Sequence, residues 1–469
     1  MLVNMNKNRN LRQKYIGDRF FYQKILAIAV PIMIQNGITN FVSLLDNIMV
    51  GQVGTAQMSG VSIVNQLIFV YNVCLFGGLS GAGIFTSQYY GRGDDEGILH
   101  TFRYKLWTGV LLTALVTVIF LTGGSALVRL YLNGSPAENE QVLQYSLGYL
   151  RVMLIGFPAF MLAQLYASTM KDCGETVVPM QAGVLAVFVN LLFNYLLIYG
   201  KFGFPKMGVL GAAVATVLSR YVEMAIVMIR MHLDQKTYSY MKGVYRTLAV
   251  PARLTRSFTV KGAPLLVNEA LWSMGMAALA QCYSVRGLDV VAGMNISNTI
   301  NNLFLVVMIS MGNAVGIIVG QLLGAGKMQE AKDTDNKLLV FSIMAVIPAA
   351  LVMFLFAPLF PKLYNTTQEI RTLAARFIML QAVFMPMHAI LNAAYFTLRS
   401  GGRTMITFLF DSVFITCVSV PIAFVLSRLT QMHVLMIFTF VNLADLMKCV
   451  IGYVMVKKNI WMQNLTAED

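Results

Sequence analysis

Charged residues and paired cysteines are both scarce in this sequence of 469 residues. Asp, Glu, Lys and Arg make up 12% of it, roughly half the share found in soluble globular proteins. A water-soluble enzyme or binding domain is therefore excluded as the main body of the chain. The five cysteines are scattered without a Cys-x-x-Cys motif, so we expect neither a disulfide framework nor a metal–thiolate site: Cys74, Cys173, Cys282, Cys417 and Cys449.

A nucleotide-binding loop is also missing. Residues 321–328, QLLGAGKM, carry Gln321 where a phosphate loop has its first glycine, and Met328 where it has Ser or Thr. No catalytic constellation stands out elsewhere. We therefore expect no ATP or other cofactor and no enzymatic activity.

Long hydrophobic runs are what the sequence has instead. Hydrophobic residues make up 57% of it, and the mean hydropathy is +0.67. Runs of about 20 residues match the roughly 30 Å hydrocarbon core of a bilayer, and continuous apolar segments exclude a β-barrel. The sequence predicts an all-α membrane protein with twelve transmembrane helices, at residues 25–48, 58–86, 104–122, 146–170, 178–199, 208–230, 260–282, 290–320, 338–358, 374–397, 404–427 and 433–456.

Lysine and arginine gather on one side of these spans. Residues 1–24, which are polar and show no cleavable signal, and residues 231–259 hold the largest clusters. The positive-inside rule places both termini in the cytoplasm of a multi-pass plasma (inner) membrane protein, which we expect to be bacterial. Basic residues beside spans favour contact with membrane lipid, and no recognition module accompanies them, so we expect no nucleic-acid partner.

The sequence is a tandem duplication. Identical residues recur first at an offset of 233 positions and then at 228: Pro31 and Pro264, Gly91 and Gly324, and Pro158 and Pro386. An even number of helices per copy keeps both copies in one orientation, related by an axis along the membrane normal. We expect two lobes that bind a transported substrate between them, with these parts: a basic arm at 1–24, an N-lobe at 25–230, a cytoplasmic linker at 231–259, a C-lobe at 260–456 and a cytoplasmic tail at 457–469.

Several longer motifs occur in order along both halves. They are PIMIQNGITNFVSLLDNIMVGQVG in span one, GRGDDE after span two, MKDCGETVVPM between spans four and five, PLLVNEALWS in span seven, GQLLGAGKMQEA after span eight and LRSGGRTMI after span ten. Together they resemble the multidrug and toxic compound extrusion (MATE) transporters. This resemblance implies a V-shaped pair of six-helix lobes and cation efflux from the cytoplasm, driven by a proton or sodium gradient.

Acidic residues inside spans are candidates for function, because a charge at the bilayer centre costs roughly 2.5 to 3.5 kcal/mol on insertion scales. The predicted spans contain five: Asp46, Glu223, Glu269, Asp411 and Asp445. Arg220 lies three residues before Glu223, and Lys448 three residues after Asp445. We interpret these two acids as members of structural ion pairs.

Asp46 has no basic residue on its own helix face. It ends a polar stripe on span one that also contains Gln35, Thr39 and Ser43, spaced by four, four and three residues. Such a stripe requires a polar or hydrated neighbour. Gln35 is accordingly a candidate contact for the substrate.

Span five offers Asn190 and Asn194 on one face, and span six offers the hydroxyl of Thr216. Their oxygens, with Asp46, suit a sodium ion, while a low-dielectric pocket could instead keep the carboxyl protonated. A third alternative is that Asp46 only fixes helix packing. The resemblance implies a second acid on span five, where this chain has Asn194; with one acid left, we favour the proton as the coupling ion and keep sodium as the alternative.

Glu269 matches an acid on span seven in another branch of the resembled family. Trp272 and Met276 share its face, which makes a plausible seat for an organic cation, although an interhelical hydrogen bond is the alternative. That branch also has an acid on span ten, where this chain has His388, which is more often structural than a proton relay. For Asp411, on span eleven, we leave open whether it binds substrate or has a structural role.

These observations favour a secondary antiporter that exports cationic amphipathic drugs and toxic compounds in exchange for protons or, less favoured, sodium. We expect its partners to be small organic cations and membrane lipid, and the protein to be a monomer. The alternative is a flippase for a lipid-linked precursor in a related duplicated fold. It would need a strongly basic central cavity, and the inner halves of the spans have almost no Lys or Arg.

Overall fold

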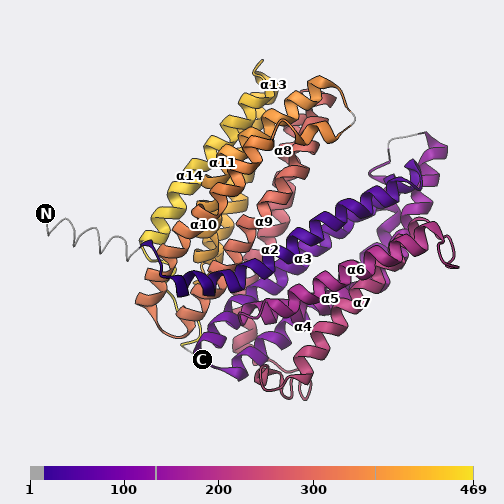
Figure 1. The fold of residues 1–469 in the computed structure, drawn as a ribbon. Coiled ribbons are helices and arrows are strands. Elements are labelled where there is room, and N and C mark those ends of the chain that lie inside the picture. Colours follow the sequence, from indigo (N-terminus) through magenta and orange to yellow (C-terminus); the bar gives the residue numbers. More distant parts are fainter. Residues whose placement is uncertain (1–14, 133–134, 365, 468–469) are drawn as a thin grey trace. The chain divides into compact units, whose positions relative to one another are not determined.

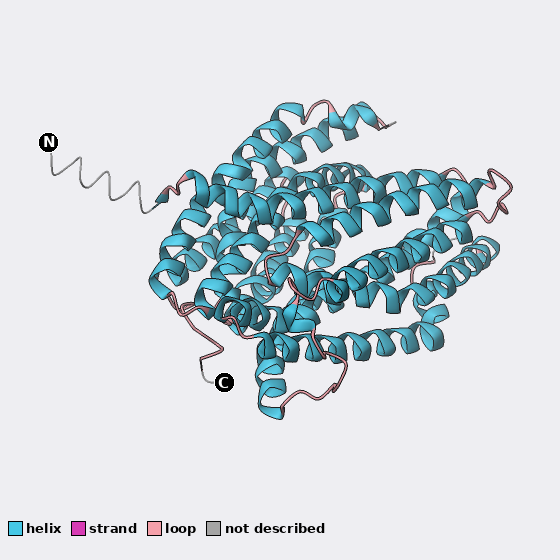
Figure 2. Ribbon diagram, turned by 60° about the horizontal axis from the view of Figure 1, so that its bottom comes forward, coloured by secondary structure: helices cyan, strands magenta, loops and turns pink. Residues whose placement is uncertain are grey.

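The chain is helical throughout the part that the structure describes. The computed structural model describes residues 15–132, 135–364 and 366–467 (Figure 1). Within these ranges Figure 2 shows helices joined by loops and no strand. The predicted basic arm lies outside the described residues as far as residue 14.

In these ranges, the first half of the chain forms α2 (Arg19–Gly51), α3 (Thr55–Arg92), α4 (Asp95–Arg129), α5 (Pro136–Asp172), α6 (Val177–Tyr199) and α7 (Val209–Leu233). The second half forms α8 (Ala252–Ser284), α9 (Leu288–Gly324), α10 (Met328–Phe356), α11 (Gln368–Ser400), α12 (Thr404–Phe408), α13 (Val420–Leu429) and α14 (Val434–Lys457). Two π-helical turns, η3 (Leu409–Val413) and η4 (Ile415–Ser419), join α12 to α13. Short 3₁₀ turns are η1 (Ser239–Met241) and η2 (Phe360–Leu363).

Eleven of the described helical segments are long and apolar enough to cross a membrane. Helix α8 is not among them because Asn268 and Glu269 interrupt its apolar middle, but it covers the predicted span 260–282. The other eleven predicted spans each overlap one helix or, for 404–427, the continuous run from α12 to α13. The predicted all-α membrane fold is confirmed.

Local sequence signals explain where some of these helices begin and end. At the start of α5, the backbone nitrogen and hydroxyl of Ser135 donate to Glu138 Oε2 at 3.1 and 2.8 Å, and Pro136 occupies the first helical position. Helix α6 ends at Gly200, whose φ of 68° is left-handed and disfavours residues with a Cβ atom.

Contacts divide the chain into two compact units. Unit 1 comprises Met1–Met33, Ser87–Asp94 and Ala263–Asp469, and unit 2 comprises Ile34–Thr86 and Asp95–Gly262. The division therefore falls inside α2, α3 and α8. The predicted lobes were derived from the duplication and have boundaries in loops, so their extents stay a prediction.

Each unit has its own apolar core. In unit 2, the ring of Tyr71 on α3 stacks on Phe157 of α5 with centroids 4.5 Å apart. In unit 1, buried residues of α9, α10 and α11 form a cluster that also includes Trp461, beyond the last helix. Each unit therefore buries apolar surface between its own helices.

Within unit 1, the end of α3 crosses the end of α9 at two glycines. A Cβ atom added at Gly91 would clash with the backbone carbonyl of Gln321, and one added at Gly324 would clash with that of Gln88. These contacts are reciprocal, because Gln88 and Gly91 correspond to Gln321 and Gly324 at the 233-residue offset. The close approach of the two backbones requires glycine at both places.

The predicted tail packs beneath this crossing. Gln88 Nε2 donates to the carbonyls of Ser400 and Gln463 at 2.9 and 3.3 Å, and Gln88 Oε1 accepts from the backbone nitrogen of Leu465 at 2.7 Å. Trp461 is 1% exposed and Thr466 is fully buried. The described part of the tail, up to residue 467, is therefore an ordered component of unit 1.

The reciprocal crossing generates a stability prediction. Gly91→Ala and Gly324→Ala should each lower the free energy of unfolding by about 1 to 3 kcal/mol, because a Cβ atom forces two backbones apart. Gly123→Ala on α4 is the matched control, since no atom lies within 4 Å of its added Cβ and alanine is the better helix former. Thermal unfolding in detergent measures all three. The crossing would be contradicted if the variants at Gly91 and Gly324 lost no more free energy of unfolding than the variant at Gly123.

Candidate functional site

The structure brings the four predicted ion-coupling residues together in unit 2. Asn194 Nδ2 on α6 donates to Asp46 Oδ1 on α2 at 2.7 Å and to Asn190 Oδ1 at 3.1 Å. Asn190 Nδ2 donates to Thr216 Oγ1 on α7 at 3.2 Å. Asn190 and Asn194 are 6% and 1% exposed, so these polar groups depend on one another rather than on solvent.

The amide of Asn190 has an unfavourable neighbour in either orientation. With Nδ2 toward Thr216, its oxygen lies 3.0 and 3.1 Å from the two carboxylate oxygens of Asp46, and all three atoms are acceptors if Asp46 is ionised. With the amide swapped, its nitrogen donates to Asp46 but lies 3.1 Å from Nδ2 of Asn194, which is also a donor. A proton or a cation between Asp46 and the Asn190 oxygen would resolve the first arrangement.

Two further groups border this site. Tyr149 on α5 is 5% exposed and lies beside Thr216 and Asp46. The sequence analysis missed it, because a single tyrosine in an apolar span carries no signal of its own. Oδ1 of Asn194 is buried without a hydrogen-bond partner among the described residues, which leaves one carbonyl-type oxygen available to a donor or cation.

The polar stripe of α2 is largely satisfied within its own helix. Thr39 Oγ1 donates to the Gln35 carbonyl at 2.8 Å, and Ser43 Oγ donates to the Thr39 carbonyl at 2.9 Å. The side chain of Gln35 lies against Gly183 of α6, and its Oε1 has no partner among the described residues. Thr39 and Ser43 thus satisfy their donors within α2, and the need of the stripe for a polar or hydrated neighbour stays a prediction.

A second polar cluster lies in unit 1. Lys448 Nζ on α14 is 3.2 Å from Asp411 Oδ1, and Asn268 Nδ2 on α8 donates to Asp411 Oδ2 at 3.3 Å. Ser412 Oγ donates to Asn268 Oδ1 at 2.6 Å. Asp411 and Ser412 belong to the π-helical turn η3, a kind of helix irregularity often found at functional sites.

This cluster corrects two expectations. Lys448 pairs with Asp411, which had been left without a partner, and not with Asp445, which lies three residues before it. Asp445 Oδ2 instead lies 3.4 Å from His388 Nε2. The pair of Arg220 and Glu223 does form, at 2.8 Å.

Glu269 lies beside this cluster on α8, within electrostatic reach of Arg399 and Asp411. Trp272 packs at the edge of an apolar cluster, and Met276 is 45% exposed. The sequence analysis named Glu269 but missed Asn268, next to it in the chain, and Arg399 within its electrostatic reach. Asn268 stood next to Glu269 in PLLVNEALWS, and a polar pair in the middle of a span was the available signal.

The described residues contain no group of three or more His, Cys, Asp or Glu side chains that could hold a metal ion. Around Asp46, the oxygens that face one another belong to the carboxylate and to Asn190. One lone pair of the Thr216 hydroxyl is already engaged, since it accepts from Asn190 Nδ2 at 3.2 Å. With Oδ1 of Asn194 included, few oxygens are free to replace the hydration shell of a hard cation.

Two separate stretches of the chain, residues 31–196 and 264–427, match the MatE family. The chain belongs to this family, the MATE transporters. Each match covers one copy of the duplication. This MATE protein is therefore a multi-pass membrane transporter and not an enzyme.

Two curated relatives of this MATE transporter come from the bacteria Thermotoga maritima and Bacillus subtilis. It is 26% identical over 418 residues to a probable multidrug resistance protein NorM of Thermotoga maritima, which covers 88% of this chain and 87% of that protein. It is also 26% identical over 411 residues to a probable multidrug resistance protein YoeA of Bacillus subtilis, which covers 87% of each.

Solved structures share its fold. A MOP superfamily transporter from Pyrococcus furiosus has a TM-score of 0.83 at 18% identity, covering 96% of this chain and 97% of that one. A variant of the Vibrio cholerae MATE transporter VcmN has a TM-score of 0.84 at 15% identity, covering 95% and 98%. At these identities the likeness concerns the fold.

The ion pair in unit 1 gives a prediction that tests whether Asp411 or Asp445 is the partner of Lys448. Asp411→Asn should lower the free energy of unfolding by about 3 kcal/mol, because it leaves the Lys448 ammonium, only 4% exposed, without its counter-ion. Asp445→Asn is the matched control and should cost much less. Thermal unfolding in detergent compares them, and a larger loss for Asp445→Asn would restore the pairing expected from sequence.

Proposed function

We propose that this MATE transporter is a secondary antiporter that exports cationic amphipathic compounds and is driven by a proton gradient. The names of its curated relatives, probable multidrug resistance proteins, support drug efflux. The coupling ion is inferred from the surroundings of Asp46. The observation that carries it is the approach of the Asn190 amide to both carboxylate oxygens, at 3.0 and 3.1 Å.

A protonated Asp46 explains the contacts better than an ionised one. Its O–H could donate to Asn190 Oδ1, while Nδ2 of Asn194 still donates to the other carboxylate oxygen. The proton removes the shorter of the two contacts between acceptors, the one at 3.0 Å between Asn190 Oδ1 and Asp46 Oδ2. An ionised Asp46 would have to turn the Asn190 amide around, so loss of the proton changes the hydrogen bonds between α2 and α6.

Sodium is the weaker alternative. Asp46 supplies at most one negative charge, and Asn194, in the place of a second acid, presents its nitrogen to Asp46. A proton needs only the carboxyl group, whereas sodium needs several oxygens to offset its dehydration. Proton binding would neutralise Asp46 and allow α2 to repack near Pro31, releasing substrate outward; deprotonation to the cytoplasm would reset the protein.

For the substrate, Glu269 is the proposed acid in unit 1, because Lys448 neutralises its neighbour Asp411. An organic cation near Glu269 would be attracted by a charge in a low-dielectric setting. Arg399 weakens this attraction, so hydrophobic contact must contribute. Trp272 and Met276, also in unit 1, are proposed as further contacts, and Gln35 of unit 2 stays a separate candidate contact.

We place the transporter in the bacterial plasma membrane as a monomer, with both termini in the cytoplasm. Small organic cations and membrane lipid are its proposed partners, without nucleic acid. The coupling ion is the only small group that this cycle requires besides the substrate.

The coupling proposal predicts the behaviour of Asp46→Asn. This variant should lose gradient-driven export almost completely while it folds normally, because an amide neither titrates nor carries charge. Asp445→Asn, which changes another acid of a predicted span in the same way, is the control and should retain export. The measurement is substrate efflux in proteoliposomes with imposed proton and sodium gradients applied separately.

Wild-type vesicles should transport on a proton gradient in sodium-free buffer. If they transport only on a sodium gradient with a protonophore present, proton coupling is wrong. If Asp46→Asn transports as well as wild type at equal abundance, Asp46 does not carry the coupling ion.

The substrate proposal predicts a charge-selective effect of Glu269→Gln. Equilibrium binding of a cationic ligand should weaken about tenfold or more, which corresponds to 1.4 kcal/mol of lost attraction, while a neutral ligand of matched shape should change little. An equal loss for both ligands would assign Glu269 to packing.

A further inference from the structure

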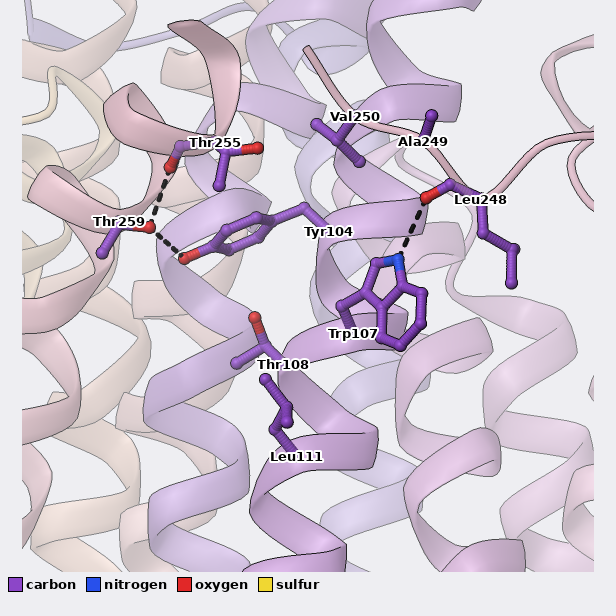
Figure 3. Close-up of a pocket in the computed structure, with 9 residues that line it drawn as sticks. All are labelled: Tyr104, Trp107, Thr108, Leu111, Leu248, Ala249, Val250, Thr255 and Thr259. Carbon is purple, nitrogen blue, oxygen red and sulfur yellow. Dashed lines mark hydrogen bonds between the residues drawn. The ribbon is translucent and has the colours of Figure 1, made fainter. Parts of the chain in front are cut away.

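A cavity of about 640 Å³ lies in unit 2, away from Asp46 and its partners. Three elements line it: α4, the linker that follows α7, and the first turns of α8 (Figure 3). Its walls include Tyr104, Trp107, Leu111, Leu248, Thr255 and Thr259. Neither the coupling cycle nor the substrate site proposed above uses these residues.

Two aromatic side chains hold the three elements together. Trp107 Nε1 donates to the Leu248 carbonyl at 3.0 Å, and the hydroxyls of Tyr104 and Thr259 are 2.9 Å apart. Figure 3 shows both polar ends turned toward the linker and α8. The rings are therefore anchored through their polar atoms, and their apolar surfaces remain for a ligand.

The cavity continues the exposed apolar face of α4. Trp107 and Leu111 are 47% and 65% exposed, and Leu115 and Val118 continue the same face at helical spacing. In a membrane protein such a face contacts acyl chains. Trp and Tyr at its end are typical of the boundary between the hydrocarbon and the head groups.

The surroundings of the cavity are basic. Residues 242–261 contain five Lys or Arg and no Asp or Glu: Lys242, Arg246, Arg253, Arg256 and Lys261. Arg253 and Arg256 lie in the first turns of α8, next to the lining residue Thr255, and both are exposed. Clusters of this kind beside a span attract anionic lipid head groups.

We propose that this cavity binds an anionic glycerophospholipid. Its acyl chain lies along Trp107 and Leu111, and its phosphate faces the hydroxyl of Thr255 and the side chains of Arg253 and Arg256. A bound lipid of this kind joins α4 to the linker and to the start of α8. Helix α8 passes from unit 2 into unit 1 at Gly262, three residues after Thr259.

Fluorescence quenching by lipids with brominated acyl chains tests this site. The chain has three tryptophans, so the Trp107 signal is the difference between wild type and Trp107→Phe. In phosphatidylcholine vesicles, brominated phosphatidylglycerol should quench this signal at a mole fraction at least about fivefold lower than brominated phosphatidylcholine. A fivefold difference in mole fraction corresponds to the usual free energy of attraction between one Lys or Arg and an anionic surface.

The double variant Arg253→Gln/Arg256→Gln should abolish this preference, because it removes the two positive charges beside Thr255. Lys201→Gln/Lys206→Gln removes the same charge from the loop between α6 and α7 and should keep the preference. Native mass spectrometry should show one retained phosphatidylglycerol fewer in the first variant only. Equal quenching of wild type by both lipids, or the same preference in both double variants, would overturn the proposal.

Discussion

The constraint on which this structure depends is that a charge inside a membrane span must be met by a polar or oppositely charged group. In unit 1, Asp411 is met by Lys448 of α14 and Asn268 of α8. In unit 2, Lys105 of α4 is fully buried and lies 2.7 Å from Asp172 at the end of α5. Each partnership crosses between helices, so the polar groups that are costly to bury also specify which helices are neighbours.

The same constraint limits what spacing along a sequence can predict. The twelve spans and the duplication follow from composition and periodicity, and the grouping of Asp46 with Asn190 and Asn194 follows from the resemblance to the family. The partner of Lys448 cannot be predicted in this way. A spacing of three residues from Asp445 allows a pair within α14, but it does not exclude a pair with an acid on another helix. The π-helical turns before α13 shift the side chains that follow them, and no periodic pattern indicates where such a turn occurs.

The duplication preserved the scaffold more closely than the polar chemistry. Thr169 and Thr397 correspond at the 228-residue offset, and each donates to the carbonyl four residues earlier in its helix. Thr169 also accepts from the ammonium of Lys105 at 3.3 Å, whereas the single hydroxyl proton of Thr397 is shared between that carbonyl and the carboxylate of Asp335, 2.6 Å away. Equivalent hydroxyls therefore face a cation in one unit and an acid in the other.

The packed tail also has a consequence for biosynthesis. Residues 459–467 are synthesised long after Gln88, yet they supply partners for its side chain. These hydrogen bonds can therefore form only after all the described helices have been made. A chain shortened before residue 459 would leave the Gln88 side chain without them.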